Sequence, residues 1–161
     1  MTSTAEENAL LIAKFYAAFQ NKDFKAMQAA YHGQATFRDP VFKTLDSKEV
    51  RAMWQMLTLT ATDLKVLCDH VQASEEAGSC VWEAWYTFSR TGRKVHNVVK
   101  ARFQFRDGLI VEHEDNFDFW RWARQAFGLT GLLIGWTSVF REKVSSMALA
   151  GLKKFMNKPM A

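Results

Sequence analysis

The chain has 161 residues, 48% of them apolar and 14% aromatic, which is enough for one domain with a real core and excludes a disordered chain. Its formal net charge of +4 is small, and most of the excess lies near the C-terminus, so a nucleic-acid-binding protein is not expected. Cys68 and Cys80 form neither a disulfide framework nor a zinc-binding spacing, so we expect reduced core cysteines and no metal.

The N-terminal segment predicts two consecutive helices. Thr4 and Glu7 have the spacing of a capping box, and the apolar residues that follow recur at helical intervals, which predicts a helix over residues 5–20. Asp23 is placed to cap a second helix, whose end is indicated by Gly33. The polar, acidic residues at the start of the chain do not resemble a secretory signal, so we expect a cytoplasmic protein.

A short strand over residues 35–38 is expected next. It runs into Asp39, which the following Pro40 restrains to an extended conformation at the strand end. Asp39 is therefore a candidate acid-base residue, although aspartate before proline is also a common turn former without chemistry. Asp46 then has capping spacing for a third helix over residues 47–58.

From residue 64 onward the apolar pattern changes to the alternation of strands. The predicted strands cover residues 64–73, 79–90, 93–106 and 109–119. Thr91-Gly92 and Asp107-Gly108 are hairpin turns, so the last three strands form an antiparallel meander.

The last of these strands carries two titratable residues on its apolar side. Alternation places Leu109, Val111, His113 and Asp115 on one face, opposite a charged and therefore solvent-facing side. A carboxylate and an imidazole are costly to bury, so their position predicts a cavity in which the pair moves protons. The alternative is a buried polar pair that is satisfied by hydrogen bonds and inert.

Several further side chains share the inner face or the neighbouring helices. They are either core residues or the apolar lining of a pocket for a small hydrophobic compound. The candidate ligand-binding residues are Tyr16, Trp54, Trp82, Tyr86, Asn97, Phe103, Phe105 and Phe117.

After the meander the chain becomes helical again. We expect helices over residues 120–127 and 138–157, joined by a glycine-rich apolar segment. The apolar stripe of the last helix has three possible partners: the open end of the pocket, a second subunit, or an anionic membrane surface. Packing on its own domain or on a partner subunit is the preferred interpretation, and membrane contact is the less favoured one.

The order of elements and five short motifs resemble the NTF2-like superfamily, in particular its ketosteroid isomerase and SnoaL-like polyketide cyclase branches. The motifs are FYAAFQNKD, ATFRDPV, TGRK, RFQFRDG and IVEHEDNFD. The resemblance implies an α+β cone, in which three N-terminal helices pack on a curved antiparallel sheet and enclose a pocket. Residues 1–127 would form this domain and residues 128–161 a C-terminal helical extension.

The comparison with the isomerases is mixed. Asp39 matches the carboxylate that they use as a proton shuttle. Phe15 stands where they have an oxyanion-binding tyrosine, with Tyr16 one position on, and Ala101 stands where they have a protonated aspartate. Loss of each donor costs on the order of 10²-fold in rate, so ketosteroid isomerisation is disfavoured.

The SnoaL-like branch resembles the chain more closely, because it places acid-base residues on the last strand, as His113 and Asp115 are placed here. It implies a homodimeric enzyme without cofactor that isomerises, cyclises or hydrolyses a small hydrophobic compound. Asp39 would be the general base, with His113 and Asp115 as the acid or orienting pair. The alternative is a non-catalytic ligand-binding or protein-interaction module of the same fold.

Overall fold

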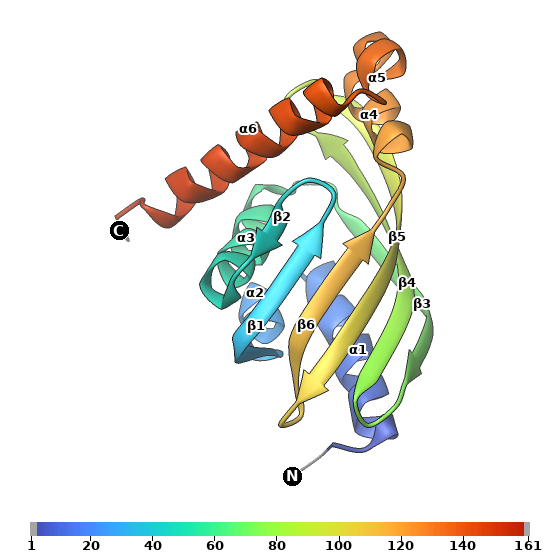
Figure 1. Cartoon of the computed structure of the whole chain (residues 1–161), viewed down its shortest axis with the longest axis vertical. Helices are drawn as coiled ribbons and strands as arrows, with labels where there is room; N and C mark the ends of the chain where they lie inside the picture. Colours follow the sequence, from blue (N-terminus) through green and yellow to red (C-terminus); the bar gives the residue numbers. More distant parts are fainter. Residues whose placement is uncertain (1–2, 160–161) are drawn as a thin grey trace.

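The computed structural model describes residues 3–159 as one curved sheet with helices on its concave side and across one end (Figure 1). In chain order the elements are α1 (Ala5–Gln20), α2 (Phe24–Ala29), β1 (Tyr31–Asp39), β2 (Lys43–Leu45), α3 (Ser47–Thr60), β3 (Lys65–Ala73), β4 (Ala77–Phe88), β5 (Arg93–Arg106), β6 (Leu109–Asn116), α4 (Phe119–Phe127), α5 (Leu129–Ile134) and α6 (Ser138–Met156).

The strands follow the order β2-β1-β6-β5-β4-β3 in a single sheet. The pairings from β6 to β3 are antiparallel, as the meander predicts, whereas β1 lies parallel to β6 and joins the N-terminal half of the chain to the last strand. The concave face and helices α1 to α3 enclose the main hydrophobic core. The predicted α+β cone is confirmed.

Local hydrogen bonds fix the predicted helix starts. Thr4 and Glu7 form the expected reciprocal capping box of α1, and Asp46 and Glu49 form that of α3. The Asp107-Gly108 turn has positive φ at both residues, which is the backbone required by a tight two-residue hairpin. These elements depend only on neighbours in the sequence, which is why the sequence predicts them.

The second helix ends earlier than predicted. It stops at Ala29, and Gly33 lies inside β1 instead of ending the helix. The reason is long-range pairing: the backbone N–H of Ile110 donates to the carbonyl of Ala30 at 2.9 Å, and Tyr31 pairs with Ile110. Tyr31, expected on the helix, is therefore the first residue of the strand.

The strict alternation expected along the last strand is also wrong at its start. Gln104 pairs with Glu112 and Phe105 with Ile110, so Val111 is an extra residue and forms a β-bulge. Ile110, predicted on the solvent side, is consequently 0% exposed. Beyond the bulge, the alternation of buried and exposed side chains agrees with the prediction, because His113 and Asp115 are 2% and 4% exposed.

The strand ends at Asn116, before the predicted boundary at residue 119. The carboxylate of Asp118 accepts a hydrogen bond from the backbone N–H of Arg121 and so caps α4. Phe119 therefore belongs to the helix and packs in a second hydrophobic cluster together with Trp122 and Phe140.

The three C-terminal helices close one end of the cone (Figure 1). Gly131 and Gly135 bring α5 against α4, since a Cβ atom at Gly131 would lie 1.9 Å from the carbonyl oxygen of Ala123. From there α6 runs back across the end of the sheet and contacts α3, with Leu152 buried in the main core. Within residues 3–159 we find no helix of the length and apolar character needed to cross a membrane.

Candidate active site

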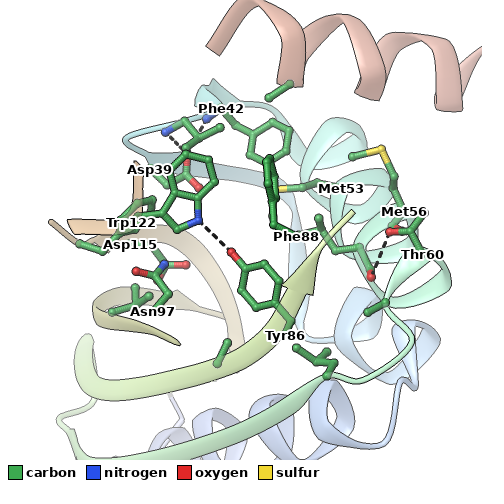
Figure 2. A pocket seen from close by; sticks show the side chains of 18 of the residues that line it. Asp39, Phe42, Met53, Met56, Thr60, Tyr86, Phe88, Asn97, Asp115 and Trp122 are labelled. Carbon is green, nitrogen blue, oxygen red and sulfur yellow. Dashed lines mark hydrogen bonds between the residues drawn. The ribbon is translucent and has the colours of Figure 1, made fainter. Parts of the chain in front are cut away.

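A cavity of about 440 Å³ lies between the sheet, α3, α4 and α6. Figure 2 shows its polar groups facing one another across a largely apolar interior. Asp39, Asn97, Tyr86 and Asp115 are among these polar residues, and the wall also includes Thr60, Thr87, Ser89 and Arg90. From α6 the wall receives Val144, Met147, Ala148 and Gly151. A small number of polar groups in an apolar enclosure is typical of a small-molecule site.

Asp39 is held at the end of β1 by its own turn. Its Oδ1 accepts hydrogen bonds from the backbone N–H groups of Val41 and Phe42, at 2.9 and 2.6 Å. The turn-forming interpretation is therefore correct, yet the same carboxyl group also lines the cavity. A turn role and a chemical role are compatible here, because the turn fixes one oxygen and the carboxyl group still faces the cavity.

The surroundings of Asp39 raise its pKa from 3.8 to about 7. Burial is the largest cause, and the negative charge of Asp115 acts in the same direction. The two backbone N–H donors oppose these effects, and the one from Phe42 is the stronger. A carboxyl group with this pKa can both accept and return a proton near neutral pH.

His113 and Asp115 belong to a buried chain of hydrogen bonds. Trp54 Nε1 lies 2.9 Å from the Tyr31 hydroxyl, which lies 2.6 Å from His113 Nδ1. On the other side of the ring, His113 Nε2 lies 2.9 Å from Asp115 Oδ1. That oxygen also accepts a hydrogen bond of 3.3 Å from Trp82 Nε1.

The direction of each bond in this chain follows from its first member. The indole N–H of Trp54 can only donate, so the Tyr31 oxygen accepts and directs its own proton to His113 Nδ1. Nε2 then carries the imidazole proton and donates it to Asp115. These hydrogen bonds hold the imidazole in one orientation, and Asp115 Oδ1 accepts from both His113 and Trp82.

Only one member of the predicted dyad lies at the cavity wall. Asp115 lines the cavity, whereas the side chain of His113 is 0% exposed and lies behind it, among the rings of Phe15, Phe37 and Phe103. The hydrogen bond from His113 instead fixes the orientation of the Asp115 carboxyl group. This geometry suits an imidazole that orients Asp115 better than one that exchanges protons with a guest molecule.

A second hydrogen bond directs a hydroxyl group into the cavity. Trp122 Nε1 donates to the Tyr86 oxygen at 2.9 Å (Figure 2). The Tyr86 proton is therefore free to be donated to a molecule in the cavity. Burial raises the pKa of Tyr86, an effect that the Trp122 bond partly offsets, so the hydroxyl stays protonated at neutral pH.

The remaining predicted ligand-binding residues divide into two groups. Trp54, Trp82, Asn97 and Phe117 line the cavity together with Tyr86. Tyr16, Phe103 and Phe105 do not: they are buried between α1 and the sheet, and the Tyr16 hydroxyl has no hydrogen-bond partner among the described residues. Phe15 and Ala101 are also buried, at 2% and 1% exposure.

Trp122 is one of the site residues that the sequence did not indicate. It lies on α4, and its contact with Tyr86 joins positions 36 residues apart. The only available signal was its place on the inner side of a short amphipathic helix. Within residues 3–159, no three His, Cys, Asp or Glu side chains are grouped so that they could hold a metal ion.

The fold and the enclosed pocket define the class as an NTF2-like α+β cone. More specifically, the sequence profile of the SnoaL-like domain matches residues 12–113, and the chain belongs to this family. A comparison with curated proteins gives no match.

Solved structures with similar folds come from several kinds of protein. An LEH-like epoxide hydrolase from M. tuberculosis has a TM-score of 0.65 at 19% identity, covering 81% of this chain and 97% of its own. IdmH from Streptomyces antibioticus, described as a candidate polyketide cyclase, has a TM-score of 0.63 at 20% identity, with 73% and 96% covered. A SnoaL-like candidate polyketide cyclase from Jannaschia sp. CCS1 has a TM-score of 0.68 at 9% identity, with 80% and 96% covered. At these identities the likeness concerns the fold alone.

Proposed function

We propose that the protein is an acid-base enzyme without cofactor that transfers a proton on a small hydrophobic compound bound in the cavity. The observation that carries the proposal is the pairing of two different carboxyl groups in one apolar enclosure. Asp39, with a pKa of about 7, takes up or returns the proton. Asp115, fixed by His113 and Trp82, carries the negative charge that raises the pKa of Asp39, and it orients polar groups of the guest.

In the proposed reaction, the Tyr86 hydroxyl supplies a hydrogen-bond donor. If Asp39 removes a proton next to a carbonyl group, the negative charge that develops on the carbonyl oxygen needs a hydrogen-bond donor. Phe15 and Ala101 cannot donate, so the Tyr86 hydroxyl, held by Trp122, is the donor that we assign. The cavity volume of about 440 Å³ and its aromatic wall suit a compact hydrophobic ketone or lactone.

The test is proton exchange into deuterated water from a panel of small hydrophobic ketones, followed by mass spectrometry. We expect the protein to catalyse incorporation of deuterium next to the carbonyl, and Asp39→Asn to reduce the rate by about 10²-fold or more. Asp69→Asn, the same change at an exposed residue of β3, is the matched control and should leave the rate unchanged. Exchange that is absent, or that survives Asp39→Asn, would contradict the assignment.

The second candidate is a ligand-binding module without chemistry. It is favoured by the apolar residues Phe15 and Ala101, which stand where the related isomerases have their oxyanion donors. Such a module would bind ketones from the panel with equal affinity in the wild type and in Asp39→Asn, while neither catalysed exchange. The homodimer and the cytoplasmic location stay predictions, and sedimentation analysis would test the first.

A further inference from the structure

The outer surface of α5 and the residues around it form an exposed apolar patch at the end of the molecule far from the N-terminus (Figure 1). This α5 patch consists of Leu129, Leu132, Leu133, Ile134, Trp136 and Val139, which are 45 to 77% exposed. Exposed apolar side chains that form a continuous patch are uncommon on soluble proteins, and such patches normally mark an interaction site.

The exposure of the patch is built into the packing of the helix. Gly131 and Gly135 form the inner side of α5, and both are buried against α4. Because the glycines occupy the only side that faces the protein, the large side chains between them must point outward. The patch is therefore part of the folded structure, not the result of a loosely attached segment.

The charge around the patch selects its partner. From residue 118 onward the chain carries two acidic side chains. Asp118 caps α4, and Glu142 is paired with Lys43 at 2.6 Å. Against them stand seven basic ones: Arg121, Arg124, Arg141 and Lys143 lie on α4 and the start of α6, next to the patch, whereas Lys153, Lys154 and Lys158 lie at or just past the far end of α6. Two copies that met through this surface would bring like charges together, whereas an anionic surface would complement it.

Two of the arginines lie next to the aromatic rings at the base of the patch. The Arg124 guanidinium lies over the ring of Trp120 at 4.4 Å, and that of Arg141 lies over Phe119 at 5.0 Å. Exposed leucines and a tryptophan that are flanked by basic residues combine apolar insertion with attraction to anionic headgroups. Neither apolar insertion nor electrostatic attraction alone gives stable attachment to a membrane, but the two together do.

We propose that the α5 patch is a peripheral membrane-binding surface that inserts its apolar side chains into the interface of an anionic lipid bilayer. The proposal applies to α5 and the start of α6, not to the apolar stripe of α6, for which packing on its own domain or on a partner subunit is the preferred interpretation. That stripe instead faces the cavity and α3, with Leu152 in the main core. The inference does not depend on the proposed catalytic chemistry.

The test is sedimentation of the full chain with vesicles of phosphatidylcholine alone or with about one third phosphatidylglycerol. We expect binding to the anionic vesicles that is at least about tenfold stronger than to the neutral ones and that weakens with added salt. Leu133→Glu should weaken it by about tenfold or more. Leu10→Glu is the matched control, because Leu10 is 52% exposed on α1, compared with 62% for Leu133.

Three outcomes would overturn the proposal. The first is no binding to anionic vesicles, and the second is an equal effect of Leu133→Glu and Leu10→Glu. The third is a dimer in the absence of lipid that Leu133→Glu converts to a monomer, because the patch would then be covered by a second copy. If Leu133→Glu does not fold, Val139→Glu, at the start of α6 and 77% exposed, replaces it.

Discussion

Replacing Asp39 by asparagine should stabilise the protein at alkaline pH. In the folded chain the pKa of Asp39 is raised from 3.8 to about 7, chiefly by burial. The amide oxygen of asparagine can still accept the hydrogen bonds from Val41 and Phe42, so the turn should be kept. The substitution therefore removes a charge that is costly to bury while it preserves the shape and the local hydrogen bonds.

The pH dependence follows from the direction of this pKa change. Below pH 3.8 the carboxyl group is protonated in both states, and its ionisation does not affect stability. Between pH 3.8 and about 7 the unfolded chain loses the proton while the folded chain retains it, so stability falls as the pH rises. Above about pH 7 Asp39 is ionised in both states, so the loss of stability caused by burying its charge is complete and no longer changes with pH.

At about 1.4 kcal/mol per pH unit, the change from 3.8 to about 7 gives an upper bound of about 4 kcal/mol for the penalty. Solvent that reaches the cavity screens the charge, so we expect Asp39→Asn to gain about 2 to 4 kcal/mol at pH 8. For a chain of this size the gain corresponds to roughly 5 to 10 °C in Tm.

The assay is urea unfolding of the wild type, Asp39→Asn and the Asp69→Asn control across this pH range. The difference between Asp39→Asn and the wild type should be small at the acidic end, grow with pH and level off above about pH 7. A difference that is independent of pH, or a loss of stability at pH 8, would refute the reasoning. A gain would also indicate that Asp39 is kept in the cavity at a cost to stability, as expected of a functional residue.

Three further substitutions test the buried hydrogen bonds, the base of the α5 patch and the helix α6. His113→Ala should cost about 3 to 5 kcal/mol in the free energy of unfolding, because it leaves a void and deprives the Tyr31 hydroxyl of its acceptor. Urea unfolding that shows no loss of stability would contradict the buried hydrogen bonds described above. Gly131→Ala should speed hydrogen exchange of the α4 and α5 backbone, because its Cβ would lie 1.9 Å from the Ala123 carbonyl oxygen. Gly151→Ala has no atom within 4 Å of its added Cβ, so this substitution should stabilise α6 by about 0.5 to 1 kcal/mol.

The sequence predicts those parts of the fold that local hydrogen bonds determine. The capping boxes of α1 and α3 and the Asp107-Gly108 hairpin each involve residues at most three apart, and all three are confirmed. The errors lie where distant strands decide the outcome. The end of α2 is set by pairing of Tyr31 with Ile110, and the bulge at Val111 is set by the register against β5.

The candidate site shows the same division. Alternation places His113 and Asp115 on the inner face, but it cannot tell which of them reaches the cavity, because that depends on how Tyr31, Trp54 and Trp82 contact them. The Tyr86 and Trp122 contact is similarly invisible in the sequence, since it needs the position of α4 relative to β4. Residue types were predictable, but their partners were not.

The position of α6 has a consequence for how such a protein could diversify. Asp39 is carried by β1, Asp115 by β6 and Tyr86 by β4, all on the rigid sheet, while α6 contributes only apolar and small side chains to the cavity. Exchanging Met147, Ala148 or Gly151 for bulkier or smaller residues would reshape the cavity and leave Asp39, Asp115 and Tyr86 where they are. In the proposed function, selectivity and reactivity therefore reside on different segments, so α6 can change to admit new compounds without moving the acid-base groups.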